Sequence, residues 1–229
     1  KRNARMTYLN IVNNVLRRLR EEEVTTVNGS TYSTMVGDFI NDAKTLVEQA
    51  TDWSALRTRE SAFVTSVDDN LYSLVGSGDD VKVMSAYDTT SANEVEYQTK
   101  EWFNNESYVN GSLAIAAKGG LTGSPTYYTF DGVDANGDTQ VRLYPMPDDA
   151  YNLRFVMVQR QTDLVNNTDV LKVPSKPVIH LAVALLARER GETGGTSTAE
   201  YFQIANKYLS DAIAIDAAKH PEEMIFRTI

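Results

Sequence analysis

The spacing of hydrophobic residues changes twice along this 229-residue chain, and that change is the strongest constraint on its fold. Near both ends apolar residues recur about every three or four positions, as on one face of an α-helix. From about residue 60 to residue 170 they alternate with polar residues instead, as in strands with one buried face. The order of helices, then many strands, then helices predicts an α+β fold.

Four helices are expected, over residues 7–23, 33–51, 177–190 and 197–219. Thr7 could cap the first helix and Ser33 or Thr34 the second, because their hydroxyls can accept a hydrogen bond from an N-terminal N–H group. The third helix is apolar on most sides, which indicates a central position. The buried stripe of the second helix is expected to comprise Met35, Val36, Phe39, Ile40, Ala43, Leu46, Val47 and Ala50.

The middle of the chain is expected to be antiparallel and rich in β-strands. Turn pairs such as Asn110-Gly111 and Asn136-Gly137 separate short alternating runs, which favours a small sandwich or an open barrel. Residues 100–105 could be a short helix or an edge segment. Strands are predicted near residues 61–67, 70–75, 80–86, 94–99, 112–117, 125–131, 138–144 and 151–160.

The simplest packing joins the two terminal helix pairs into one helical bundle that carries the β-rich region as an insertion. The predicted bundle is discontinuous, formed by residues 1–58 and 172–220, and the insertion domain covers residues 59–171. Residues 221–229 then form a C-terminal extension.

Composition and charge exclude several classes of function. The chain has no cysteine, so disulfides and cysteine-based sites are excluded. No apolar run reaches the roughly 20 residues that span a bilayer, and no membrane association is expected. The net charge is −9, and residues 1–20 carry six basic side chains and no acid, which leaves −15 on the rest. An acidic bulk argues against tight wrapping of nucleic acid.

No motif for catalysis, a metal or a cofactor stands out, and the chain is expected not to be an enzyme. Asp134, Asn136 and Asp138 resemble part of a calcium loop, but Pro145 stands where that loop needs a glutamate. A hairpin turn at Asn136-Gly137 is the simpler interpretation. A core position for His180 is favoured over a catalytic one, and an unrecognised carboxylate pair stays open.

Two segments are candidates for partner contacts. Arg17, Arg18 and Arg20 could meet phosphates or an acidic surface, although a solvated helix end is the simpler interpretation. The C-terminal segment bears large apolar side chains that need a groove, either on its own domain or on a partner. Its candidate contact residues are Met224, Ile225, Phe226, Arg227 and Ile229.

Several stretches, taken in order, resemble the head–tail adaptor proteins of short-tailed bacteriophages, including the tail-tubular adaptors of the T7-like group. The resemblance rests on residues 6–19, on Phe39-Ile40-Asn41-Asp42-Ala43 closed by Asp52-Trp53-Ser54-Ala55-Leu56, and on Val141-Arg142-Leu143-Tyr144-Pro145-Met146-Pro147. Val173-Pro174, an alanine-rich helix and a tyrosine-bearing last helix complete the order.

This resemblance implies a structural protein of the virion, located at the head–tail junction. The chain would self-associate into a ring, expected to be a dodecamer, between the portal protein and the tail nozzle. Double-stranded DNA would pass through the ring without sequence-specific binding, and the C-terminal segment would reach the portal. Alternatives are another neck or tail-completion protein, or a carbohydrate-binding module suggested by the tyrosine-rich middle.

Overall fold

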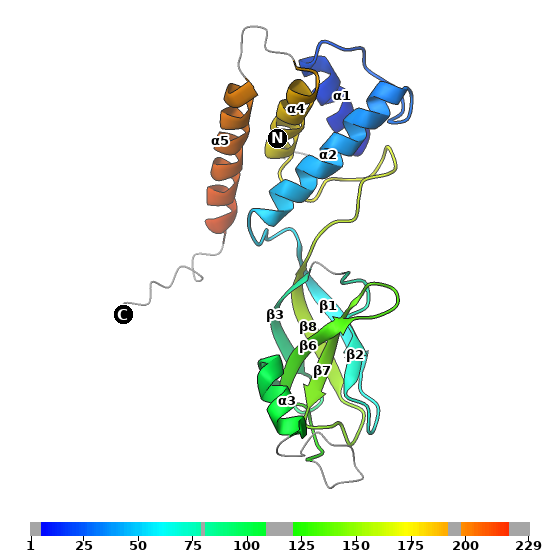
Figure 1. Cartoon of the computed structure of the whole chain (residues 1–229), viewed down its shortest axis with the longest axis vertical. Coiled ribbons are helices and arrows are strands. Elements are labelled where there is room, and N and C mark those ends of the chain that lie inside the picture. The colour runs from blue at the N-terminus through cyan, green and yellow to red at the C-terminus, as the bar shows by residue number, and fades with distance from the viewer. Residues whose placement is uncertain (1–5, 79–80, 109–120, 192–197, 220–229) are drawn as a thin grey trace, which may run out of the picture. The chain divides into compact units, whose positions relative to one another are not determined.

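The protein is a mixed α+β chain, described by a computed structural model over residues 6–78, 81–108, 121–191 and 198–219 (Figure 1). Five helices occur there: α1 (Tyr8–Arg18), α2 (Thr31–Gln49), α3 (Lys100–Tyr108), α4 (Ser175–Glu189) and α5 (Thr198–Ala217). The strands are β1 (Arg57–Val64), β2 (Leu71–Ser73), β3 (Val81–Asp88), β4 (Asn93–Glu94), β5 (Glu96–Tyr97), β6 (Tyr127–Val133), β7 (Thr139–Tyr144) and β8 (Asn152–Gln159).

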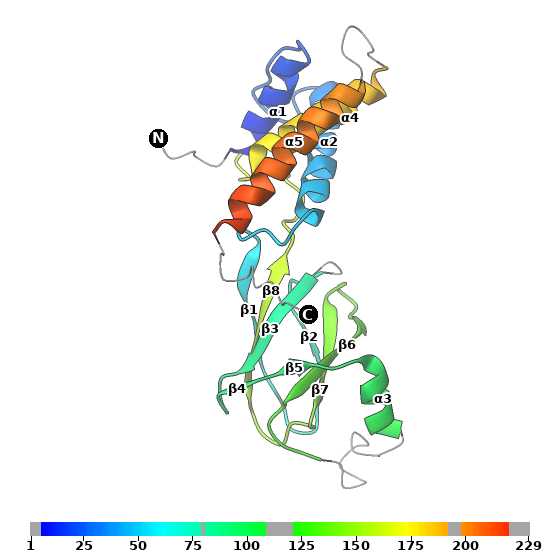
Figure 2. The same ribbon diagram turned by 90° about the vertical axis from the view of Figure 1, so that its left-hand side faces the viewer.

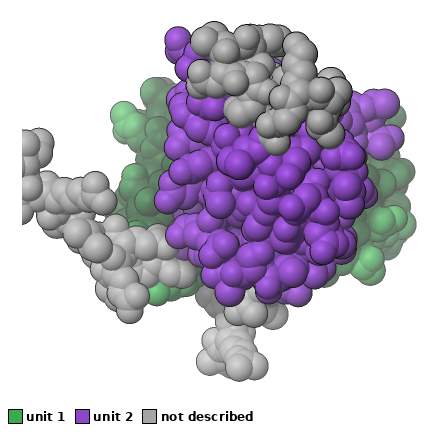
Figure 3. Space-filling view, turned by 90° about the horizontal axis from the view of Figure 1, so that it is seen from below, with its two compact units in different colours: residues 1–56, 160–229 green, residues 57–159 purple. Residues whose placement is uncertain are grey.

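The chain divides into two compact units (Figure 3). Unit 1 contains residues 1–56 and 160–229, and unit 2 contains residues 57–159. All helices except α3 belong to unit 1, and all strands belong to unit 2. None of the described helices combines the length and apolarity needed to cross a lipid bilayer.

Helix α4 is the central element of unit 1, as its apolar sequence predicted. It contacts α1, α2 and α5, whereas α1 also contacts α2 (Figure 2). The core between these helices is made of aliphatic side chains, which include Ile11, Val12, Val15, Val36, Ile40, Val47, Val178, Ala182 and Leu186. Trp53 is buried after α2 and its indole N–H donates to the Val47 carbonyl (2.7 Å), so it anchors that helix end.

Helix α1 ends at Arg18, five residues before the predicted end. Arg20 has a left-handed φ of 61°, and the N–H groups of Glu21 and Arg20 donate to the carbonyls of Leu16 and Arg17. These two bonds define a Schellman motif, which closes a helix once one residue turns left-handed. Periodicity alone could not reveal this end, because the apolar stripe stops before it.

Helix α2 begins two residues earlier than predicted, and neither Ser33 nor Thr34 is its N-cap. Ser30 caps it: its hydroxyl oxygen accepts a hydrogen bond from the Ser33 N–H group, and the Ser33 hydroxyl oxygen accepts one from the Ser30 N–H group, which completes a capping box. Within the predicted stripe, Leu46 and Ala50 were also wrong, because both side chains are exposed, Leu46 by 48%.

Unit 2 is a sandwich of two four-stranded sheets, in the orders β1-β8-β3-β4 and β2-β7-β6-β5. The pairs are antiparallel except β5 with β6. Both sheets contribute to one core, which contains Leu74, Ala86, Val95, Tyr128, Val141, Leu143, Leu153 and Phe155. The barrel alternative is therefore wrong: the described strands form two open sheets and no closed barrel.

Two predicted strands, 94–99 and 112–117, have no single counterpart among the described strands. The predicted strand 94–99 is divided, because the chain passes from one sheet to the other at the buried Val95. The predicted strand 112–117 lies outside the described residues. The helical alternative for residues 100–105 is confirmed by α3, whose Trp102 and Phe103 pack against Tyr127 and Tyr144.

The Asp134 segment is the hairpin turn between β6 and β7, as favoured from the sequence. The Asp134 carboxylate accepts hydrogen bonds from the N–H groups of Asn136 (2.8 Å) and Asp138 (3.0 Å). Gly137 supplies the positive φ of 86°. The acceptor oxygens of Asp134 therefore serve the turn, and no group of three or more His, Cys, Asp or Glu residues in the described segments is placed to hold a metal ion.

Replacing Gly37 by alanine should destabilise unit 1. A Cβ atom at Gly37 would lie 2.3 Å from the hydroxyl oxygen of Tyr8, a side chain that is itself buried. Overpacking of this kind costs about 1–3 kcal/mol, more than alanine gains as a helix former. We expect Gly37→Ala to lower the free energy of unfolding measured by denaturant titration.

The double variant Gly37→Ala/Tyr8→Phe should regain most of that loss, because it removes the clashing oxygen. Equal stability of Gly37→Ala and Gly37→Ala/Tyr8→Phe would contradict the contact with the Tyr8 hydroxyl as the cause of the destabilisation.

Candidate functional site

Residues 160–173, which join β8 to α4, form a segment that we call the strap; it binds α1 and α2 through main-chain groups. The N–H groups of Tyr8 and Leu9, in the first turn of α1, donate to the carbonyls of Asp169 (2.8 Å) and Asn167 (3.2 Å). First-turn N–H groups have no partner within their own helix. The strap therefore caps α1, and the predicted cap Thr7, although in the N-cap position, makes no side-chain capping bond.

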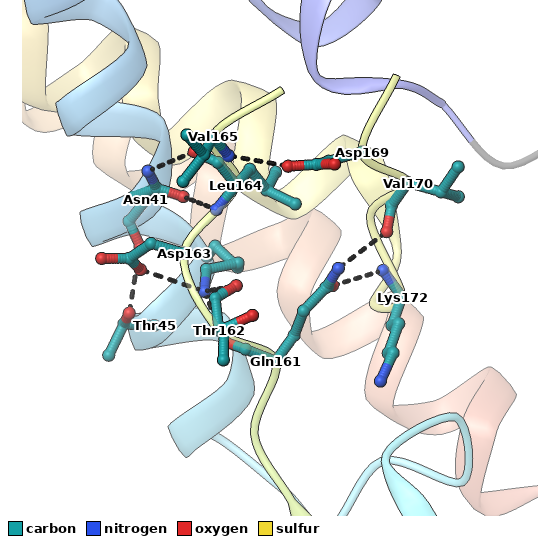
Figure 4. A network of polar contacts seen from close by, with 11 residues as sticks. Asn41, Thr45, Gln161, Thr162, Asp163, Leu164, Val165, Asp169, Val170 and Lys172 are labelled. Carbon is teal, nitrogen blue, oxygen red and sulfur yellow. Dashed lines mark hydrogen bonds and ion pairs between the residues drawn. The ribbon is translucent and has the colours of Figure 1, made fainter. Parts of the chain in front are cut away.

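Asn41 fixes the middle of the strap to α2. Its side-chain NH₂ group donates to the Leu164 carbonyl (3.1 Å), and its side-chain oxygen accepts from the Leu164 N–H (2.9 Å) (Figure 4). One amide thus satisfies both main-chain groups of a residue whose side chain is buried. Within the strap, Gln161 bridges Val170 and Lys172 in the same manner (Figure 4).

Lys44 fixes the start of the strap to the same helix. Its side chain is only 1% exposed, and its ammonium group donates to the carbonyls of Gln161 (2.7 Å) and Thr162 (3.1 Å). The Asp163 carboxylate lies 3.2 Å away and supplies the opposite charge. A buried ammonium without such partners is very unfavourable, so detaching the strap would leave this charge without acceptors.

Glu48 lies one turn after Lys44 and is also buried. Burial raises the pKa of its carboxyl group above the ordinary value, against the opposing effects of Lys44 and of a hydrogen bond from the Gln161 main chain. Its Oε1 atom is buried without a hydrogen-bond partner among the described residues. Lys44 and Glu48 continue the spacing of Val36 and Ile40, and this pair of charges on a buried face was the signal that sequence reasoning missed.

The outer side of the strap is a polar hollow of about 380 Å³, lined by residues 161–166, Asp169 and Val170. Asp169 accepts hydrogen bonds from the N–H groups of Val165 and Asn166, and these bonds lower the pKa of its carboxyl group. Burial, together with Asp38, Asp163 and Asp169, raises the pKa of Tyr8 to about 12. Asp163 and Asp169 both line the hollow, so its wall is acidic.

The predicted basic residues at the end of α1 do not converge on one site. Arg17 forms an exposed ion pair with Glu23 (3.2 Å), and the Arg18 guanidinium donates to Asn14 (3.0 Å). Arg20 holds the left-handed position described above. Arg18 lies close enough to α4 to help burial lower the pKa of His180. These local partners favour the interpretation of a solvated helix end.

Of the remaining predicted residues, His180 is described by the structure and the C-terminal candidates are not. His180 is half-buried and its ring stacks on Tyr208 of α5, with ring centroids 4.4 Å apart. The sequence favoured a core position for His180, but its side chain packs between two helices and is only partly buried. Met224, Ile225, Phe226, Arg227 and Ile229 lie outside the described residues.

A second hollow, of about 500 Å³, lies in unit 2 beside β3 and β5. Tyr97 is 52% exposed at its rim, but its ring meets Tyr128 at 67° and Phe130 at 38°. A carbohydrate module would present exposed coplanar rings, and this hollow does not.

Replacing Arg20 by glycine should stabilise the protein by roughly 0.5–1 kcal/mol, because glycine removes the strain of a side chain in the left-handed region. The control Arg17→Gly, within α1, should lower stability by a similar amount. Thermal unfolding of both variants checks the opposite signs, and destabilisation by both would contradict the Schellman ending.

Replacing Glu48 by glutamine should stabilise the protein at neutral and alkaline pH. The pKa of Glu48 in the fold lies above the reference value of 4.5, so its ionised form opposes folding, and the stability that the protonated form contributes is lost as pH rises through the folded pKa. We expect Glu48→Gln to raise the unfolding free energy at pH 8. That gain should shrink as the pH falls towards 4.5.

The exposed Glu22→Gln variant is the control for the substitution itself, because no burial is relieved there, and it should leave the unfolding free energy at pH 8 nearly unchanged. A gain for Glu48→Gln that is equal across this range would contradict the role given to burial.

Comparison with known proteins agrees with the resemblance seen in the sequence. No curated protein gives a significant match. The model of the family described as SU10 adaptor protein matches residues 6–223, which is nearly the whole chain and includes both units. The chain therefore belongs to the SU10 adaptor protein family and is a structural adaptor protein of a bacteriophage.

Proposed function

We propose that this protein is a subunit of the ring that connects the portal to the tail nozzle at the head–tail junction of the virion. Family membership over residues 6–223 is the observation that carries the proposal. In this role the chain has three kinds of partner: the portal protein, tail proteins and further copies of itself, with a dodecamer as the expected ring.

The construction of unit 1 supports its role as the rigid block of such a ring. The strap links the first and last helix pairs through Asn41, Lys44 and the N-terminus of α1. Helices from both ends of the chain meet at α4. We propose that these four helices act together as the helical bundle that holds copies and portal in place, while residues 57–159 serve as the insertion that meets the tail or the outside.

The distribution of charge supports passage of DNA without binding. Residues 57–159 carry 15 acidic and seven basic side chains, a net charge of −8, whereas unit 1 carries 16 and 15, a net charge of −1. A wall that repels phosphate lets double-stranded DNA slide past without adhering. Arg17 and Arg18 at the end of α1 have local partners, Glu23 and Asn14, which favours a solvated helix end over a phosphate site.

We assign the portal contact to Met224, Ile225, Phe226, Arg227 and Ile229. They are large apolar side chains with one cation at the end of the chain. Extended segments of this kind bind by placing alternate side chains in pockets of a partner.

Purified protein mixed with cognate portal rings should add one ring of density beneath each portal in electron micrographs. Deletion of residues 222–229 should abolish this added density while leaving the unfolding transition unchanged, because the apolar contacts to the portal are lost. Absence of added density with the full-length chain would refute the adaptor role.

A length-matched variant with Met224, Ile225, Phe226 and Ile229 changed to serine separates side-chain contacts from chain length, and it should also fail to dock. The triple variant Arg17→Ala/Arg18→Ala/Arg20→Ala is the control and should dock normally. Docking by the deletion variant would show that residues 222–229 do not make the portal contact. The proposed ring would not be affected by that result.

A further inference from the structure

Helix α5 has one flank that the other described elements do not cover. Of the described helices, α5 makes its main contact with α4, and only Ala205 and Asp216 are buried along it. Ile204 is 44% exposed and Ile215 is 67% exposed. They are three turns apart and so lie on the same side of the helix, about a quarter turn from its buried line. We call the surface of Ile204, Tyr208 and Ile215 the α5 flank.

Cations surround the middle of the α5 flank. The Lys176 ammonium of α4 lies over the Tyr208 ring, 5.6 Å from its centroid, and Lys207 of α5 is exposed next to it. Asp211 is the one exposed acid between Tyr208 and Ile215. Glu200, one turn before Ile204, is a second exposed acid on the same side of the helix. The flank thus combines branched apolar side chains with charges of both signs, and its two lysines lie beside Tyr208.

The outer side of the strap has the complementary character. Val165 is 67% exposed and Val170 is 40% exposed, and both line the hollow of about 380 Å³. The carboxylates of Asp163 and Asp169 line the same hollow, and no Lys or Arg is among its described lining residues. We call this surface the strap face. It offers apolar side chains, a concavity and an excess of negative charge.

The two surfaces lie on opposite sides of unit 1. Helix α5 packs on one side of the layer of α1, α2 and α4, and the strap runs along the other side, against α1 and α2 (Figures 1 and 2). A single copy therefore cannot close one surface on the other. Two different, complementary surfaces on opposite sides are what a head-to-tail ring requires of its subunit.

We propose that the occupant of the strap face is the α5 flank of a second copy of this chain. The inference rests on the proposed ring, and it names the surfaces that join neighbouring subunits. Ile204 and Ile215 cover Val165 and Val170, and Lys207 approaches the carboxylates of Asp163 and Asp169. Burial of exposed apolar surface provides the affinity, and the charges fix the orientation.

The absence of native cysteine permits a direct test, because every thiol in a variant is an introduced one. Three exposed positions serve: Ile204 and Val165 on the proposed contact, and Asn206 on the opposite side of α5 as a control. Each variant is assembled on portal rings, treated with a short bis-maleimide and separated by denaturing electrophoresis. Thermal unfolding confirms that each variant folds.

The double variant Ile204→Cys/Val165→Cys should give a ladder of covalent multimers, because every copy then links to the next. Each single variant should stay monomeric, and so should Asn206→Cys/Val165→Cys. Dimers from Ile204→Cys alone would show an α5-to-α5 contact and overturn the proposal.

Portal-bound rings without a ladder from the Ile204→Cys/Val165→Cys variant would overturn this contact while the adaptor function stands. Absence of rings with the unmodified chain would refute both. As an independent readout, Ile204→Asp/Ile215→Asp should raise the protein concentration needed for ring formation about tenfold or more. Asn206→Asp should leave it unchanged, and equal behaviour of the two variants would also overturn the contact.

Discussion

The buried ammonium group of Lys44 is the interaction on which the arrangement of unit 1 depends. It is satisfied by two strap carbonyls and the Asp163 carboxylate, none of which belongs to its own helix. Because a buried cation must keep its partners, the strap can lie in only one register on α2. That register places Leu164 opposite Asn41 and brings the Asn167 and Asp169 carbonyls onto the first turn of α1. One charge thereby helps to position three separate segments.

The contact of Lys44 with the strap lies where the chain returns from unit 2 to unit 1. The insertion leaves unit 1 after Leu56 and returns at Arg160, and its first and last strands, β1 and β8, pair with Arg57 opposite Val158. The outgoing chain is held by the buried Trp53 and by Asp216, which accepts hydrogen bonds from Ser54. The returning chain is held by Lys44 at residues 161–163. Both segments that connect the units are thus fixed to unit 1 a few residues from the point where the chain leaves it or returns to it.

The helices and strands that follow a hydrophobic period were predictable from the sequence. The contacts that follow no such period were not. The stripes of α1 and α4 predicted their buried faces, and alternation predicted most of the strands. The end of α1 depends on the backbone angle of Arg20, and the start of α2 depends on Ser30, three residues before its partner Ser33. Neither position changes the apolar period. The strap has no period at all, because it binds through main-chain carbonyls that every residue possesses.

Lys44 and Glu48 are visible in the sequence as charges that lie on an otherwise apolar helix face. Their i+4 spacing continues Val36 and Ile40, so two charges interrupt a buried face, and such charges must have partners from elsewhere in the chain. The sequence could not indicate which segment supplies them. Likewise, the tail that carries the portal proposal is visible only as composition, and it stays a prediction.

The separation of charge between the units also determines where copies of this chain can approach one another. Charge of one sign on neighbouring subunits opposes association, and it does so most where it is concentrated. Unit 2 carries −8, whereas unit 1 carries −1 with acids and bases nearly balanced. Close contact between copies is therefore least opposed through the helices of unit 1. The acidic sandwich suits surfaces that should stay apart, face DNA or meet a basic partner. The α5 flank and the strap face both belong to unit 1, the unit whose charge least opposes contact with another copy of itself.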